Sequence, residues 1–145
     1  MTLKKTVLSF FLFLIFFSIN AQEWVTNFEI AKKIASKENK KIILVFQGSD
    51  WCTPCIKLDK EIWSTQDFKN YAKEHFVLVK ADFPRKKKNK LSEINIENNK
   101  KLMELYNKKG YFPFVVVFDK NAKTLGNTGY KKTTPSEYIK ILTSF

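Results

Sequence analysis

The stretch LVFQGSDWCTPC, Leu44 to Cys55, joins an apolar run to the two cysteines of a 145-residue chain. The run itself, KIILVFQ from Lys41 to Gln47, is mostly β-branched or aromatic, which predicts a strand buried on both faces. Gly48 ends this strand, and we expect a helix from about Cys52 to Ile62. A buried strand that leads into a Cys-x-x-Cys helix therefore forms the centre of the expected fold.

Outward from this centre, apolar strands alternate with amphipathic helices. Helices are expected at Trp24–Lys37, after a capping-box-like Ser64, at Leu91–Lys109 and after an N-cap at Thr134; strands are expected at Phe76–Asp82, Phe114–Asp119 and Thr124–Tyr130. The last two strands flank a turn and can pair as a hairpin. This order predicts an α/β fold with a helix/sheet/helix sandwich and a central mixed sheet that ends in a β-hairpin.

The chain begins with two lysines, then an apolar run from Val7 to Ile19, then Ala21. This order is typical of a secretory signal peptide, and the run is shorter than the roughly 20 residues that span a bilayer as a helix. We expect residues 1–21 to be a signal peptide and residues 22–145 to be one domain; an uncleaved N-terminal anchor is the alternative. The protein is then periplasmic or secreted, where disulfides persist.

The formal net charge of the chain is +12. We find no nucleic-acid-binding motif and expect no nucleic-acid partner. Five of the cations lie within six residues, Arg85 to Lys90, after the second expected strand. This segment is either a solvated loop or a contact site for an acidic partner or an anionic membrane surface.

The two cysteines have three possible uses: a structural cross-link, half of a metal site, or a redox pair. A cross-link over so short a loop stabilises least in the chain-entropy model. A structural zinc site needs about four ligands, whereas this motif supplies two, although Cu(I) can be held by two thiolates. A redox pair is favoured because Cys52 at a helix N-terminus, where backbone N–H groups are unpaired, is stabilised as a thiolate, the nucleophile in disulfide exchange.

The segment LVFQGSDWCTPC resembles the strand, Trp-Cys-x-x-Cys and helix of the thioredoxin superfamily, and GYFPFVVVFD resembles its proline loop. The chain is similar to exported thioredoxin-like proteins that carry SDWCxxCxKLDxEVF-type sites and a DFPRKKK-type loop. It is also similar to the C-terminal domain of periplasmic thiol:disulfide interchange reductases. The resemblance implies a thioredoxin-like fold over nearly all of the mature chain.

The resemblance also implies roles for individual residues. Cys52 is expected to attack a substrate disulfide and Cys55 to resolve the mixed disulfide. Trp51 is expected to shape partner docking, and Pro113 to be a cis-proline facing the cysteines. The Phe112 backbone is expected to pair with an extended substrate segment, as in β-augmentation.

The chain departs from the superfamily pattern on the strand before the cysteines. The buried aspartate that precedes the motif in many thioredoxins aligns with Phe46. Asp59 is the best substitute for it and is expected to assist Cys55; a solvent-facing ion-pair partner is the alternative. Lys80, on the second strand, is expected under the site.

The implied function is that of an exported thiol:disulfide oxidoreductase with no cofactor beyond its redox-active disulfide. Thr53 and Pro54 between the cysteines favour a reductant or isomerase, including a role in cytochrome c assembly, over an oxidant. Expected partners are protein disulfide substrates and a membrane thiol reductase as electron donor, and the protein is expected to be a monomer. The alternatives are a Cu(I) or other metal carrier and a thioredoxin-fold interaction module.

Overall fold

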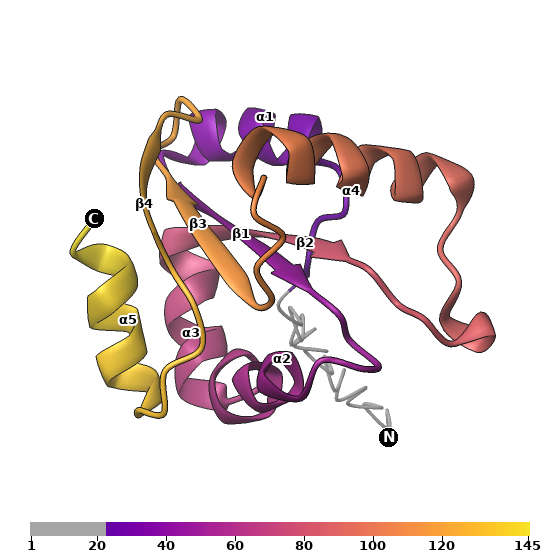
Figure 1. Cartoon of the computed structure of the whole chain (residues 1–145). Helices are drawn as coiled ribbons and strands as arrows, with labels where there is room; N and C mark the ends of the chain where they lie inside the picture. The colour runs from indigo at the N-terminus through magenta and orange to yellow at the C-terminus, as the bar shows by residue number, and fades with distance from the viewer. Residues whose placement is uncertain (1–22) are drawn as a thin grey trace, which may run out of the picture.

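The computed structural model describes residues 23–145 (Figure 1). The expected signal peptide, residues 1–21, lies outside the described residues. Within the described part of the chain, no helix has both the length and the apolar character needed to cross a membrane.

The elements follow the order expected from the sequence, with two short additional helices. They are α1 (Phe28–Glu38), β1 (Lys41–Gln47), α2 (Thr53–Leu58), the π-helical η1 (Asp59–Trp63), α3 (Gln66–His75), β2 (Phe76–Asp82), the 3₁₀-helical η2 (Lys87–Asn89), α4 (Glu93–Tyr106), β3 (Phe114–Phe118), β4 (Thr124–Thr128) and α5 (Pro135–Thr143). Side-chain caps fix the starts of α1, α3, α4 and α5. Asn27, for example, accepts hydrogen bonds from Glu29 N and Ile30 N, and Thr134 accepts one from Glu137 N.

The sheet has the strand order β2-β1-β3-β4. Strands β1 and β2 are parallel, whereas β1–β3 and β3–β4 are antiparallel. The mixed sheet and its closing hairpin therefore confirm the expected fold class. The parallel pair positions the site. Its carboxyl ends, Gln47 and Asp82, lie opposite each other, and the two segments that surround the cysteines begin at these ends.

Two helical layers cover the sheet, and alternate residues of β1 face opposite layers (Figure 1). Ile42, Leu44 and Phe46 pack toward α1 and α4. Ile43 and Val45 pack toward α2, η1, α3 and α5. All five side chains are fully buried, so the apolar run KIILVFQ serves both cores, as expected for a strand covered on both faces.

Two expected helices differ from the structure. The first begins at Phe28, not Trp24, because Val25 forms a parallel bridge with Val79 and the Asn27 side chain caps the helix. The other, expected at Leu91–Lys109, is α4 at Glu93–Tyr106, and its apolar residues Ile94 and Leu105 are 73% and 66% exposed. Helical periodicity identified this helix but not its inner face, because the two buried residues of the helix are the apolar Leu102 and the polar Asn99.

Candidate active site

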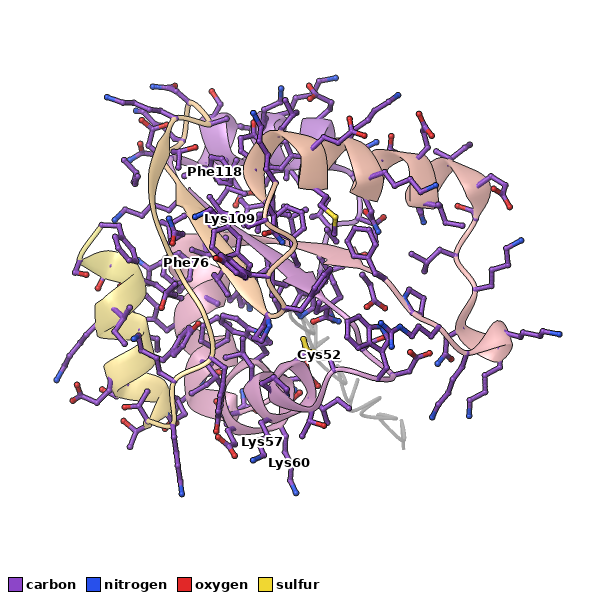
Figure 2. All side chains as sticks on the ribbon, viewed as in Figure 1. Cys52, Lys57, Lys60, Phe76, Lys109 and Phe118 are labelled. Atoms are coloured by element: carbon purple, nitrogen blue, oxygen red, sulfur yellow. A yellow bond between two sulfur atoms is a disulfide. The ribbon has the colours of Figure 1, made fainter. Side chains whose placement is uncertain are left out.

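Cys52 and Cys55 form a disulfide at the start of α2. Cys52 is the N-cap residue, with extended backbone, and its carbonyl accepts the hydrogen bond from Ile56 N at 3.0 Å. Figure 2 shows Cys52 at the point where the chain enters this helix. The expected helix start is therefore confirmed, with Pro54 in the first turn where its missing N–H breaks no helical bond.

The two cysteines differ little in exposure in this disulfide form. Cys52 is 5% exposed and Cys55 is 3% exposed, so both side chains are buried. In this form the sulfur of Cys52 is bonded back to Cys55 of the helix, and little of the residue is open to solvent. The surrounding segments add cover, since aromatic and proline residues from two loops lie beside the start of α2.

The first of these loops precedes β3. The Phe112–Pro113 peptide bond is cis, as expected, and Pro113 is buried. The Phe112 ring packs edge-on against Trp51, with 5.5 Å between ring centroids. Within residues 23–145, Phe112 makes no backbone–backbone hydrogen bond, so its N–H and C=O are free to pair with an extended segment.

Trp51 is fixed in orientation from two sides. Its Nε1 donates a hydrogen bond of 2.7 Å to the carbonyl of Phe83, the residue after β2. On the other side the indole closely approaches Gly48, where an added Cβ would lie 2.2 Å from Trp51 Cε2. Gly48 is therefore required by this close approach, and Trp51 links the end of β1 to the segment after β2.

That second segment, residues 83–90, we call the basic loop. Asp50 holds its backbone: one carboxylate oxygen accepts from Arg85 N at 2.9 Å and the other from Lys86 N at 3.0 Å and Asn89 Nδ2 at 2.9 Å. These bonds, first that from Arg85 N and then that from Asn89, lower the pKa of Asp50 from 3.8 to about 2. Asp50 is thus a carboxylate at neutral pH, and the backbone of the loop is anchored rather than only solvated.

Asp82, at the end of β2, holds the segment that precedes the Cys-x-x-Cys motif. Its carboxylate accepts hydrogen bonds from Ser49 N at 2.9 Å and Ser49 Oγ at 2.6 Å. Its carbonyl accepts a bond of 2.9 Å from the side chain of Asn99, the buried polar residue of α4. We call Ser49, Asp50, Asp82 and Asn99 the polar clamp. The sequence analysis missed all four residues, although an aspartate directly before Trp-Cys was a visible signal.

The expectations for Asp59, Phe46 and Lys80 have different outcomes. The Asp59 carboxylate accepts a hydrogen bond from Ser64 Oγ at 3.2 Å, and its assistance to Cys55 stays a prediction. Phe46 faces the α1 and α4 layer, so it does not occupy the position under the site. Val45, on the opposite face, pairs in register with Lys80 and is the strand residue on the side of α2.

Lys80 lies on the expected side of the sheet but has an aromatic partner. Its Nζ lies 4.6 Å from the centroid of the Trp24 ring, a cation–π contact. Trp24 in turn packs edge-on against Trp63 of η1, at 5.8 Å between centroids. Lys80 therefore contacts Trp24, which packs against the far end of the cysteine helix.

A metal site has no support from further ligands in the described part of the chain. Residues 23–145 contain no cluster of three or more histidine, cysteine, aspartate or glutamate side chains that is arranged to bind a metal. In the disulfide form neither sulfur is a thiolate. The metal-carrier and interaction-module alternatives stay untested.

Comparisons with known proteins agree with this fold. A Thioredoxin-like family model matches residues 23–120, and the chain belongs to this thioredoxin-like family. The chain is 34% identical over 105 residues to the disulfide bond reductase DsbH of Chlamydia pneumoniae, over 72% of this chain and 61% of that protein. It is 27% identical over 60 residues to the thioredoxin-related protein DsbJ of the same organism, over 41% of this chain and 17% of that protein.

The matched regions thus span less than two thirds of either curated relative. Among solved structures, a DsbH oxidoreductase is similar with a TM-score of 0.77 and 31% identity, covering 86% of this chain and 83% of that one. A disulphide isomerase from Xylella fastidiosa Temecula1 shares the fold, with a TM-score of 0.60 and 22% identity over 81% of this chain and 86% of that one.

Proposed function

We propose that this protein is a thiol:disulfide oxidoreductase in which Cys52 is the attacking thiol and Cys55 the resolving thiol. One observation carries the proposal: the Cys52–Cys55 disulfide lies at the start of α2, in a chain whose cis-proline loop contacts Trp51 through Phe112. The similarity to a disulfide bond reductase over 105 residues supports it.

The exchange balances in two steps. The Cys52 thiolate of the reduced protein attacks one sulfur of the substrate disulfide, which forms a mixed disulfide and releases the other substrate sulfur as a thiolate that takes up a proton. Cys55 then loses its proton and attacks the Cys52 sulfur, which releases the second substrate thiolate. Two electrons pass to the substrate, and the protein is left with the Cys52–Cys55 disulfide.

Stabilisation of the Cys52 thiolate comes from the backbone at the helix start. The first N–H groups of a helix have no carbonyl partner within it, and Thr53 and Cys55 supply such groups beside Cys52. Helices α2 and η1 are continuous from Thr53 to Trp63, so their aligned peptide dipoles act together at Cys52. We expect the pKa of the Cys52 thiol to lie below its ordinary value in the reduced protein.

Substrate binding uses the free backbone of Phe112. An extended peptide that pairs with its N–H and C=O would lie across the start of α2, beside the Trp51 ring. Asp59, half-buried one turn after Cys55, is proposed to receive the proton of Cys55 during resolution. An Asp59→Asn variant should then shift the pH profile of the resolving step and leave the attack by Cys52 unchanged.

The direction of electron flow is proposed to be that of a reductant or isomerase. No charged residue lies between the cysteines, so the helix terminus provides most of the stabilisation of the thiolate, and a less stabilised thiolate favours the disulfide and hence electron donation. We propose that the protein acts in the periplasm or outside the cell, receives electrons from a membrane thiol reductase and can serve cytochrome c assembly.

Insulin reduction by the purified protein with dithiothreitol tests the activity. Wild type should accelerate precipitation of the insulin B chain, and Cys52→Ser should reduce the rate to that of dithiothreitol alone. Cys55→Ser should instead accumulate a mixed disulfide with the substrate. Equal rates for wild type and Cys52→Ser would refute the proposed function.

The equilibrium constant with glutathione tests the direction. A reductant has a disulfide that remains formed at high ratios of reduced to oxidised glutathione, whereas an oxidant is reduced easily. Mass spectrometry of alkylated samples measures the fraction of Cys52–Cys55 disulfide across the series. A protein whose disulfide is already fully reduced at low ratios of reduced to oxidised glutathione would be an oxidant, contrary to the proposal.

A further inference from the structure

The basic loop carries positive charge that its own surroundings do not neutralise. The side chains of residues 85–90 are exposed. Lys90 forms an ion pair with Glu93, at 3.1 Å, but within residues 23–145 no carboxylate oxygen lies within 4.0 Å of the side-chain nitrogens of Arg85, Lys86, Lys87 or Lys88. The oxygens of Asp50, the acidic residue bound to this loop, accept two backbone N–H groups and an amide instead.

The backbone of the loop is held in one arrangement. Besides the bonds to Asp50, Phe83 N donates to Gln47 O at 2.9 Å and Asn89 N donates to Lys86 O at 2.9 Å. A surface that is ordered before binding loses less conformational entropy when a partner arrives. The loop therefore presents its cations from a preformed backbone, in contrast to a disordered basic tail.

The loop also lies beside the redox pair. The guanidinium of Arg85 stacks on the Trp51 ring, with 3.8 Å between Arg85 Cζ and the ring centroid. Trp51 precedes Cys52 directly, so the cations begin one side chain away from the attacking sulfur. When a partner protein brings its disulfide to Cys52, the partner's residues next to that disulfide therefore lie close to the basic loop.

A cavity under the loop adds an apolar contact. It has a volume of about 290 Å³ between the loop and the first turns of α4. Its apolar lining comes from Phe83, Pro84, Leu91 and Ile96, and Lys86, Lys87 and Lys90 also line it. An acidic segment that carries an apolar side chain matches both features.

We propose that the basic loop is a docking surface for an acidic segment next to the reactive disulfide of a protein partner. The inference rests on the proposed function, because it assigns a substrate class to the same site. Charge complementarity selects the occupant: the four unpaired cations attract carboxylates, and an acidic segment gains contacts that a neutral one lacks.

Two synthetic peptides with the same intramolecular disulfide test the proposal, one flanked by glutamates and the other by glutamines. The readout is the ratio of their second-order rate constants with the reduced protein, from stopped-flow tryptophan fluorescence. Wild type should react about tenfold faster with the glutamate peptide at low salt, and high salt should remove this preference.

The variant Lys86→Gln/Lys87→Gln/Lys88→Gln should bring the ratio close to one. Its matched control is Lys33→Gln/Lys37→Gln/Lys120→Gln, which removes the same charge from exposed lysines around α1 and the turn after β3 and should keep the preference. The three loop substitutions leave the backbone bonds to Asp50 in place, and circular dichroism checks that both variants are folded.

The outcomes separate the two proposals. Equal rates for both peptides with wild type, or an equal loss in both variants, would overturn the docking surface and leave the exchange activity standing. Reaction with neither peptide would overturn the proposed function and this inference together. Sedimentation with phosphatidylserine vesicles covers the other occupant: loop-dependent vesicle binding without a peptide preference would assign the loop to a membrane surface.

Discussion

The two ends of the cysteine helix are held in different ways. At the start of α2, the polar clamp and the Trp51–Phe83 hydrogen bond fix the residues around Cys52. At the end of η1, Trp63 packs edge-on against Trp24, Phe68 and Tyr138 at 5.8, 4.7 and 5.4 Å between centroids. We call these four residues the aromatic core. The Trp63 Nε1 atom has no hydrogen-bond partner among the described residues, so Trp63 is held by packing alone.

The two ends should therefore contribute differently to the stability of the fold and to the geometry of the site. Apolar burial is non-directional and scales with the area removed from water, so the aromatic core should account for much of the free energy of folding. Hydrogen bonds contribute less net free energy but require defined distances and angles. The polar clamp should therefore fix the positions of the side chains and backbone around the disulfide and change the free energy of folding only a little.

The largest expected effect is in the aromatic core. Trp63→Ala should lower the free energy of unfolding by about 3–5 kcal/mol, since it removes a fully packed indole and leaves a cavity. Urea denaturation followed by far-UV circular dichroism measures this change. Trp63→Phe is the matched control and should lose clearly less, because it keeps a ring and removes the unpaired Nε1 donor. A small loss in Trp63→Ala would break the comparison between the two ends.

Gly48→Ala tests the close approach of Trp51 to the end of β1. The new Cβ would lie 2.2 Å from Trp51 Cε2, so the indole must move, and overpacking of this kind costs about 1–3 kcal/mol. Insulin reduction should slow as Trp51 leaves Phe83 O. The double variant Gly48→Ala/Trp51→Ala should recover part of the lost stability; strictly additive losses would show that the two residues do not interact.

Tyr138→Phe tests a hydrogen bond inside the aromatic core. The Tyr138 hydroxyl donates to Gly129 O at 2.8 Å, and its loss should cost about 1 kcal/mol. Burial raises the pKa of Tyr138, so the phenol stays protonated and the cost should be the same at about pH 5 and about pH 9. Urea denaturation at both pH values measures it. A cost that disappears at the higher pH would contradict burial of this hydroxyl.

The smallest expected effect on stability is that of Asp50→Ala, which should instead free the basic loop. Backbone amides of Arg85 and Lys86 should exchange hydrogen faster, as measured by NMR, whereas Asp59→Ala should leave them protected. The lowered pKa of Asp50 means that its contribution is complete above about pH 4 and is lost as the pH falls through about 2. The stability difference from wild type should shrink over that interval; a constant difference would show that the charge is irrelevant.

The sequence was sufficient where one local rule dominates. The run KIILVFQ needs burial on both faces, and it is the central strand β1. The N-cap at Thr134 depends on a side chain and a backbone N–H only three residues apart, and it is confirmed. The cis bond at Pro113 followed from the resemblance of GYFPFVVVFD to a known loop and is confirmed as well.

Sequence reasoning did less well where distant segments meet. The sequence predicted that Trp24 begins a helix, but pairing of Val25 with β2 overrides local helical periodicity. The buried aspartate of many thioredoxins aligned with Phe46, whereas the alternation of β1 puts Val45 on the side of α2. The basic loop had two open interpretations, because its anchor, Asp50, is 35 residues away from Arg85 in the chain.

By itself, the sequence determined the order of helices and strands, the position of the cysteine pair at a helix start and the excess of positive charge, since these depend on neighbours within a turn or a strand. Tertiary structure alone decided which carboxylates form hydrogen bonds around the site, how deeply Cys52 is buried and where the cations of the basic loop lie. The physical reason is range: periodicity and capping are local, whereas the hydrogen bonds of Asp50 and Asp82 join segments more than 30 residues apart.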